Sequence, residues 1–286
     1  KPERKFMTFH EFIKDWLGDH GQANKLEEQF EQMKGDIAGK IYMPITYKGA
    51  KIFIKLGLSP NKVSIMNLIC SFLIFYAVIM LGRGHTLDIP ELITQQPFYG
   101  SWFIPLAFFV LFTGIIDGID GSIARLLDIK SKSGAWFDNV IDRISDTLLL
   151  VCFIPTSFMI LPVYGLNFRW MVWTNIILIF IYEYMRARHE GLGLHETKPY
   201  IGERITRFLM FFTFFLMYGV SSFAVLISYS INPSGAIKWT NFHNWITTWT
   251  MLIFQISLLI IMVLSTILFA RYIWKGLKKM DNITID

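Results

Sequence analysis

Long apolar runs constrain this chain more than any other feature of its sequence. A helix needs about 20 predominantly apolar residues to cross the hydrocarbon core of a bilayer. Of the 286 residues, 53% are hydrophobic and 17% are charged, which is typical of a membrane protein. The sequence therefore predicts an all-α integral membrane protein with six transmembrane helices. We expect them at Val63–Leu81, Trp102–Ala124, Trp136–Leu161, Met171–Met185, Ile205–Ile231 and Ile246–Phe269, the fourth being the weakest because it ends in charged residues.

The distribution of lysine and arginine predicts the orientation of these helices. With both termini in the cytoplasm, 24 of the 27 Lys and Arg residues fall on the cytoplasmic side, and only Arg83, Arg169 and Lys238 fall outside. Because positive charge marks cytoplasmic loops, we expect both termini and the active site to be cytoplasmic. The net charge of +5 then reflects this orientation and attraction to anionic headgroups, so no nucleic-acid partner is expected.

The N-terminal 57 residues are expected to be a cytoplasmic segment that precedes a membrane domain over residues 58–286, which ends in a basic tail. Residues 1–40 mix charged and aromatic side chains, which predicts one or two soluble helices broken near Gly18–Gly21. In residues 41–60, lysines alternate with apolar residues, which suits an amphipathic helix in the membrane interface. An ordinary exposed amphipathic helix is the alternative interpretation.

Two pairs of aspartates follow the second apolar run. Asp117 and Asp120 are three residues apart and Asp138 and Asp142 are four apart, so each pair lies on one face of its helix. Because consecutive helices joined by a short turn are antiparallel, we expect the pairs to meet near the cytoplasmic surface. A carboxylate in hydrocarbon costs up to about 2.5–3.5 kcal/mol, and four together repel one another. Divalent cations would relieve both costs, since carboxylate oxygens are good ligands for Mg²⁺ or Mn²⁺. A solvated acidic helix end is the alternative.

The residues between the acids favour a cavity. Gly121 and Ala124 continue the face of the first aspartate pair, and Gly134 precedes Asp138 by one turn, so small side chains would leave room for a ligand. Arg125 at the helix end is a candidate donor to phosphate oxygens. Asp146, one turn after Asp142, is expected to be an ion-pair or capping residue. Cysteines at positions 70 and 152 lie in expected spans and suggest buried small side chains.

The full pattern, Asp117-x-x-Asp120-Gly121-x-x-Ala124-Arg125-x8-Gly134-x-x-x-Asp138-x-x-x-Asp142, resembles the motif of the CDP-alcohol phosphotransferase family. The resemblance covers about residues 58–279. It implies that an acceptor hydroxyl attacks the lipid-bearing phosphorus of a CDP-lipid donor and that CMP leaves. It further implies that Asp117, Asp120, Asp138 and Asp142 bind two Mg²⁺ or Mn²⁺ ions, that Asp142 is also the general base, and that the protein is a homodimer. The CDP group would be bordered by Asn61, Asp117, Gly121, Ala124, Arg125 and Gly134.

A group of arginines suggests the acceptor. Arg186, Arg188, Arg204 and Arg207 occupy the expected cytoplasmic ends of two helices, and Arg271 ends the last helix. Their forked side chains match phosphate geometry, although loop charge of the cytoplasmic side explains each one almost equally well. The stretch from Arg186 to Gly193 and the run Gly202-Glu203-Arg204-x-x-Arg207 resemble the branch of the family that makes phosphatidylinositol phosphate or archaetidylinositol phosphate. This implies inositol phosphate as the acceptor, and diacylglycerol or archaeol as the lipid. Glu183 departs from this branch, which usually has a small hydroxyl residue there.

Other functions are compatible with parts of the pattern. The same chemistry could use glycerol phosphate, serine or inositol, although the Gly-Lys-x-Lys-Thr run of the glycerol-phosphate branch is absent. Membrane prenyltransferases also present aspartates and Mg²⁺ to a diphosphate, but their acidic motifs are far apart in sequence. A cation transporter would use the four aspartates as an ion path, but no second acidic set lies near the opposite side.

Overall fold

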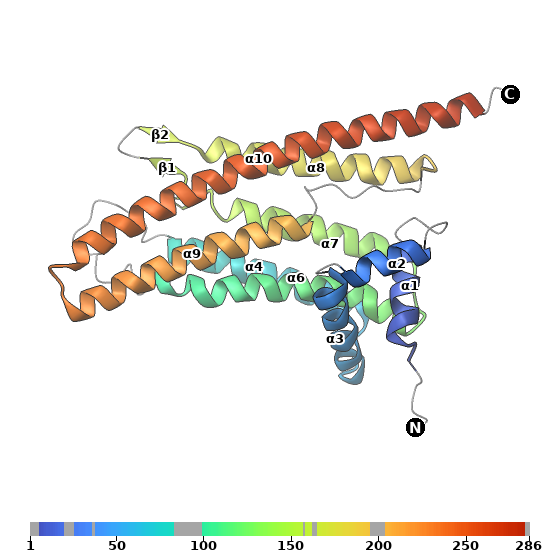
Figure 1. Cartoon of the computed structure of the whole chain (residues 1–286), viewed down its shortest axis with the longest axis horizontal. Helices are drawn as coiled ribbons and strands as arrows, with labels where there is room; N and C mark the ends of the chain where they lie inside the picture. Colours follow the sequence, from blue (N-terminus) through green and yellow to red (C-terminus); the bar gives the residue numbers. More distant parts are fainter. Residues whose placement is uncertain are drawn as a thin grey trace. The chain divides into compact units, whose positions relative to one another are not determined.

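The computed structural model describes residues 6–19, 26–35, 38–82, 99–156, 158–161, 165–194 and 204–283, and these are nearly all helical (Figure 1). The chain packs into two units. Of the described residues, the first unit contains 6–70 and 112–145, and the second contains the others. The aspartate motif belongs to the first unit, and the expected acceptor arginines belong to the second.

In the first unit, the N-terminal region forms helices α1 (Phe9–Asp19) and α2 (Leu26–Gly35), and a π-helix η2 (Ala38–Tyr42) that runs directly into α3 (Met43–Lys55). The expectation of one or two helices in the first 40 residues is thus confirmed. α1 begins with a capping box. The Glu11 carboxylate accepts a hydrogen bond from the backbone N–H of Thr8 at 2.7 Å, and Thr8 Oγ1 accepts one from the N–H of Glu11 at 3.3 Å.

α1 packs on α3, and α3 in turn packs against α6 (Phe103–Leu126). Phe12 of α1 is fully buried, with its ring 5.3 Å from that of Tyr47, and Tyr47 Oη donates to the carbonyl of Met7. A Cβ atom at Gly118 of α6 would lie 2.8 Å or less from the ring of Tyr42 and its hydroxyl, so a glycine is required where the two segments touch. Whether α3 lies in the membrane interface stays a prediction.

The helices that carry the motif are α4 (Pro60–Gly82), α6 and α7 (Lys132–Val151). α6 ends in a Schellman motif, in which Ile129 N–H donates to the carbonyl of Ala124 and Asp128 takes a left-handed φ of 53°. α3 and α8 (Arg169–Gly191) end in the same way, but there glycine takes the left-handed position, at Gly57 and Gly193. Asp128 is therefore unusual, because it accepts a conformation that normally selects glycine.

The second unit is built around α8, α9 (Arg204–Ile231) and α10 (Ala236–Ile283), and Figure 1 shows α8 and α9 lying alongside α10. Its core contains many aromatic rings, among them Phe103, Phe153, Phe158, Phe214 and Phe254, packed with aliphatic side chains. Buried polar pairs join the helices across this core. Asn175 Nδ2 of α8 donates to Gln255 Oε1 of α10 at 2.9 Å, and Ser221 of α9 is hydrogen-bonded to His243 Nδ1 of α10 at 2.7 Å.

Four helices among the described residues are long and apolar enough to cross a membrane, by length and composition. They are Pro60–Gly82, Tyr99–Leu126, Arg204–Ile231 and Lys238–Asp281. The first, second, fifth and sixth expected spans fall within them. The last of these helices has 44 residues, which at about 1.5 Å each gives about 66 Å, twice the hydrocarbon thickness, so part of it extends beyond a bilayer. The protein is therefore an integral membrane protein, and the two further spans stay predictions.

The third expected span, Trp136–Leu161, is wrong in its extent. α7 ends at Val151, and a turn follows in which Thr156 N–H donates to the carbonyl of Phe153. Pro155 lies in this turn and cannot continue a helix. The end of the expected span instead forms β1 (Ile160–Leu161), which pairs antiparallel with β2 (Leu166–Asn167), so the chain is not strictly all-α. The fourth expected span, Met171–Met185, lies within α8.

Candidate active site

Polar side chains of α4 hold the first aspartate pair. Ser64 Oγ donates to Asp120 Oδ2 at 2.6 Å, and Asn67 Nδ2 donates to Asp117 Oδ1 at 3.0 Å. Ser64, Asn67 and Asp120 are all buried, with the Asp120 side chain 4% exposed. A buried carboxylate must be hydrogen-bonded or paired, and these donors meet part of that requirement. The sequence signal for both donors was their spacing, since Asn61, Ser64 and Asn67 repeat every three residues in a mainly apolar helix.

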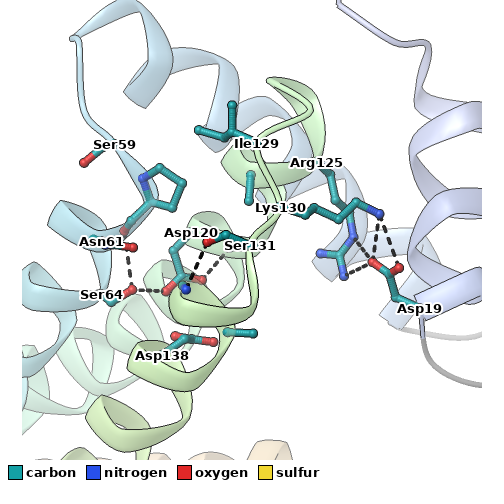
Figure 2. A pocket seen from close by; sticks show the side chains of 15 residues that line it. Asp19, Ser59, Asn61, Ser64, Asp120, Arg125, Ile129, Lys130, Ser131 and Asp138 are labelled. Atoms are coloured by element: carbon teal, nitrogen blue, oxygen red, sulfur yellow. Dashed lines mark hydrogen bonds and ion pairs between the residues drawn. The ribbon is translucent and has the colours of Figure 1, made fainter. Parts of the chain in front are cut away.

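The turn between α6 and α7 brings the second aspartate pair to the first. Ser131 caps α7, because its Oγ accepts the backbone N–H of Gly134 at 3.0 Å. Only Lys130 separates this cap from the Schellman motif that ends α6, so the reversal is short. Figure 2 shows the carboxylates of Asp120 and Asp138 pointing toward each other from the two helices. The expectation that the motif helices are antiparallel neighbours agrees with this arrangement.

A cavity of about 590 Å³ opens between these elements (Figure 2). Its volume lies in the range of about 300–1,000 Å³ that is usual for ligand sites. The residues that line it come from the N-terminal helix, α4, α6, the turn and α7: Asp19, Ser59, Pro60, Asn61, Ser64, Asp120, Gly121, Ala124, Arg125, Ile129, Lys130, Ser131, Gly134, Ala135 and Asp138. Seven of the residues predicted for the donor and metal sites are therefore brought together, namely Asn61, Asp120, Gly121, Ala124, Arg125, Gly134 and Asp138. Of the predicted residues, Asp117 and Asp142 are not part of this lining, although they lie on the same two helices.

The basic side chains that line this cavity form ion pairs with acids of α1. Arg125 Nη2 donates to Asp19 Oδ2 at 3.0 Å, and Lys130 Nζ lies 3.1 Å from the same oxygen and 2.6 Å from Asp15 Oδ2. Burial disfavours the charged form of Asp19, but the hydrogen bond from Lys130 and the charge of Arg125 outweigh it and lower the pKa of Asp19. Burial likewise acts against the charge of Lys130, but its hydrogen bonds to Asp15 and Asp19 raise the pKa of Lys130.

The aspartates supply the type of oxygen ligand that divalent cations prefer. Asp120 and Asp138 face one cavity, Asp117 lies one turn from Asp120, and Gly121 and Gly134 leave the space between the helices open. Among the described residues, no three acidic, imidazole or thiol side chains are gathered closely enough to hold an ion as they stand. Like-charged carboxylates repel, so a bound cation would lower the cost of bringing them together.

In the second unit, two of the predicted acceptor arginines share one acid. Arg207 Nη2 lies 2.6 Å from Asp146 Oδ2, and Arg204 Nε donates to Asp146 Oδ1 at 3.1 Å. The side chains of Arg207 and Asp146 are 3% and 6% exposed, and that of Arg204 is 13% exposed. The expectation that Asp146 is an ion-pair residue is confirmed. Glu183 approaches Arg207 at 3.8 Å, which gives this departure from the usual family pattern a structural partner.

The remaining predicted arginines are less enclosed. Arg186 lies 3.8 Å from Glu183 and over the ring of Tyr182, and one third of its side chain is exposed. Arg188 and Arg271 are exposed. Arg83 and the Gly202-Glu203 pair lie outside the described residues. The structure thus brings Arg204 and Arg207 together at Asp146, and Glu183 lies near both Arg207 and Arg186.

Comparison with known proteins identifies the family. The model of the CDP-alcohol phosphatidyltransferase family matches residues 57–270. The chain belongs to the CDP-alcohol phosphatidyltransferase family. It is therefore a phosphotransferase, and membership of this family favours an enzyme over a cation transporter or a prenyltransferase. Helices α1, α2 and α3 precede the matched residues.

Individual CDP-alcohol phosphatidyltransferase relatives agree with this assignment. An uncharacterised protein of Aquifex aeolicus is 33% identical, in a match that spans 37% of this chain and 58% of the relative. An archaetidylinositol phosphate synthase of Pyrococcus horikoshii is 27% identical over 63% of this chain and 80% of its own length. Among solved structures, the phosphatidylinositol phosphate synthase of Mycobacterium tuberculosis with manganese and citrate matches at a TM-score of 0.52. That match covers 80% of this chain and 88% of the other at 20% identity, and therefore shows a shared fold.

Proposed function

We propose that this protein transfers a phosphatidyl-type group from a CDP-lipid to a hydroxyl of inositol phosphate and releases CMP. The observation that carries the donor half is the cavity of ligand size that Asp120 and Asp138 of the aspartate motif line together. The acceptor half is supported by the named archaetidylinositol phosphate synthase relative and by the arginines of the second unit. The solved mycobacterial synthase with bound CDP-DAG, at a TM-score of 0.52, is compatible with a CDP-lipid donor.

The residues of the cavity have distinct proposed roles. Asn61 and the open faces of Gly121 and Gly134 border the nucleotide, and Arg125 binds its phosphates. Asp117, Asp120, Asp138 and Asp142 hold two Mg²⁺ or Mn²⁺ ions. When bound, such ions neutralise charge on the diphosphate and on the departing CMP.

Asp142 is proposed to act as the general base. It takes the proton of the acceptor hydroxyl as the oxygen forms a bond to the lipid-bearing phosphorus. The bond from that phosphorus to the bridging oxygen of the diphosphate breaks, and CMP leaves with the electron pair. Most of the rate enhancement in phosphoryl transfer comes from positioning and from charge stabilisation, which suits a site made of fixed carboxylates and arginines.

For the acceptor, we propose that Arg204 and Arg186 bind the phosphate of inositol phosphate, and Arg188 and Arg271 complete the pocket. Arg207 is included in the pocket, but its burial against Asp146 gives it a larger share in holding Arg204 in place. We further propose six spans, an interfacial α3, a cytoplasmic active site with cytoplasmic termini, and a homodimer. The lipid is diacylglycerol or archaeol.

The test of this function is an acceptor screen with purified full-length protein and Mg²⁺ or Mn²⁺. CMP release is measured with inositol phosphate, glycerol phosphate, serine and inositol, each against CDP-diacylglycerol and CDP-archaeol. Inositol phosphate should give the highest kcat/KM, and a preference for glycerol phosphate, serine or inositol would overturn the acceptor assignment. Arg204→Ala should raise the KM for inositol phosphate more than the KM for the CDP-lipid, whereas Lys238→Ala, an exposed residue of α10, serves as the matched control.

A further inference from the structure

α1 reaches the donor cavity from outside the matched family residues. It is capped by Thr8 and Glu11 and is fixed to α3 by the buried ring of Phe12 against Tyr47. Asp15 and Asp19 are one turn apart, so both carboxylates leave α1 on the same face. Asp19 is among the residues that line the cavity. α1 thus contributes a wall residue to a site whose motif begins about 100 positions later in the sequence.

The contacts of α1 fall on two basic side chains of the cavity. Asp19 accepts hydrogen bonds from both Nε and Nη2 of Arg125, at 3.2 and 3.0 Å, and from Lys130 Nζ (Figure 2). Asp15 adds an ion pair to Lys130 at 2.6 Å and lies 3.7 Å from Arg125 Nε. Two acids and two bases therefore form one network in which each acid approaches both bases.

This network sets the direction of the Arg125 guanidinium. Asp19 binds the edge formed by Nε and Nη2, while Nη1 lies only 3.1 Å from where a Cβ of Gly121 would be. Nη1 therefore lies beside the Cα of Gly121, and Gly121 lines the cavity. The side chain of Arg125 is 12% exposed, so its charge needs partners, and a long side chain held in one rotamer binds a ligand at a lower entropic cost.

We propose that Asp19 and Asp15 are positioning residues of the donor site, which hold Arg125 and Lys130 in the orientation that binds the phosphates of the CDP-lipid. The inference rests on the proposed function, because it takes the cavity to be the donor site. The opposite role, in which the acids of α1 compete with the donor phosphates for the two bases, predicts the opposite change in donor affinity. The positioning role is favoured because Asp19 binds the edge of Arg125 that is formed by Nε and Nη2, and not the Nη1 end at Gly121.

The test compares steady-state kinetics and direct CDP-lipid binding for the full chain and for Asp19→Asn. We expect the KM and the Kd for CDP-lipid to rise roughly tenfold, the size expected for losing a charge-assisted hydrogen bond, while kcat and the acceptor KM change little. Asp19→Glu should restore part of the affinity. In an Arg125→Gln background, Asp19→Asn should have a much smaller effect, because the group on which it acts is gone. Glu27→Gln is the matched control, since it breaks the exposed ion pair of α1 with α2 away from the cavity.

The outcomes separate this inference from the proposed function. If the unaltered protein releases no CMP from any CDP-lipid, the proposed function fails. If it is active but Asp19→Asn leaves the donor KM unchanged or lowers it, the positioning role is wrong and only this inference fails. A fall in kcat together with a rise in both KM values and a lowered Tm, none of them restored by Asp19→Glu, would show a merely structural role for Asp19. That result would also overturn the positioning role.

Discussion

Replacing Arg207 by glutamine removes a deeply buried charge of the second unit. The side chains of Arg207 and Asp146 are 3% and 6% exposed and their nearest atoms are 2.6 Å apart. Removing one partner of a buried ion pair costs about 3–5 kcal/mol, because the other charge is left in a poor solvent. Arg204 still approaches Asp146 in the variant, so we expect the free energy of unfolding to fall by about 3 kcal/mol, at the low end of that range.

Replacing Arg204 by glutamine should lower the free energy of unfolding by a smaller amount. Its side chain is 13% exposed, and Arg207 would continue to neutralise Asp146 at the shorter distance. We expect about 1.5 kcal/mol, the lower value for a hydrogen bond to a charged group. At about 2–4 °C per kcal/mol for chains approaching this size, the Tm should fall by roughly 6–12 °C for Arg207→Gln and 3–6 °C for Arg204→Gln.

The assay is thermal unfolding of the full-length protein in one detergent, with Lys238→Gln as the control because Lys238 is exposed. The double variant Asp146→Asn/Arg207→Gln should lose less stability than the sum of the two single variants, because neither member of the Arg207–Asp146 pair is then left as a buried charge without the other. An equal or larger fall for Arg204→Gln than for Arg207→Gln would refute the assignment of the larger structural share to Arg207. So would additive losses in the double variant.

Three further predictions concern the first unit. Asp142→Asn should lower CMP release by roughly 10²–10⁴-fold while calorimetry shows CDP-lipid binding retained, and near-normal turnover would remove Asp142 as the base. Asp120→Ala should raise the Mg²⁺ or Mn²⁺ concentration for half-maximal activity roughly tenfold or more, and an unchanged titration curve would exclude Asp120 from the metal site. The lowered pKa of Asp19 stabilises the fold above the ordinary pKa of 3.8, and this stability is lost as the pH falls through the lower folded pKa. The raised pKa of Lys130 stabilises the fold below the ordinary pKa of 10.5, and this stability is lost as the pH rises through the higher folded pKa. The ratio of donor KM between Asp19→Asn and the unaltered protein should therefore stay constant from about pH 6 to 9, and a ratio that drifts in this range contradicts the network.

The sequence was most informative where its signals are periodic and local. The apolar runs at Val63–Leu81 and Trp102–Ala124 fall within helices of the structure, because length and hydropathy decide a span without reference to partners. Asp120 and Asp138 could be expected to meet, because helical spacing and a short turn leave little other choice. The predicted span Trp136–Leu161 was too long because its apolar residues after Val151 were given more weight than Pro155.

Contacts between distant parts of the chain could not be predicted. The ion pairs of Asp19 with Arg125 and Lys130 join residues 106 and 111 positions apart, and no local pattern marks such a pair. The β1–β2 hairpin has two residues in each strand, too few for an alternating pattern to be seen. Ser64 and Asn67 carried a readable signal in their spacing, but the partners of their hydrogen bonds became known only from the structure.

The turn between α6 and α7 also explains why the two halves of the motif must be separated by a fixed number of residues. The left-handed Asp128 ends α6, Ile129 closes the Schellman hydrogen bond, and Ser131 already caps α7. One residue added or removed within α7 before Asp138 would turn its side chain by about 100° around the helix axis and direct it away from Asp120. Substitutions here can be compensated by neighbours, but changes in length cannot. The stretch between Arg125 and Asp138 is thus expected to tolerate substitutions at positions other than Asp128, Lys130, Ser131 and Gly134, but no insertions.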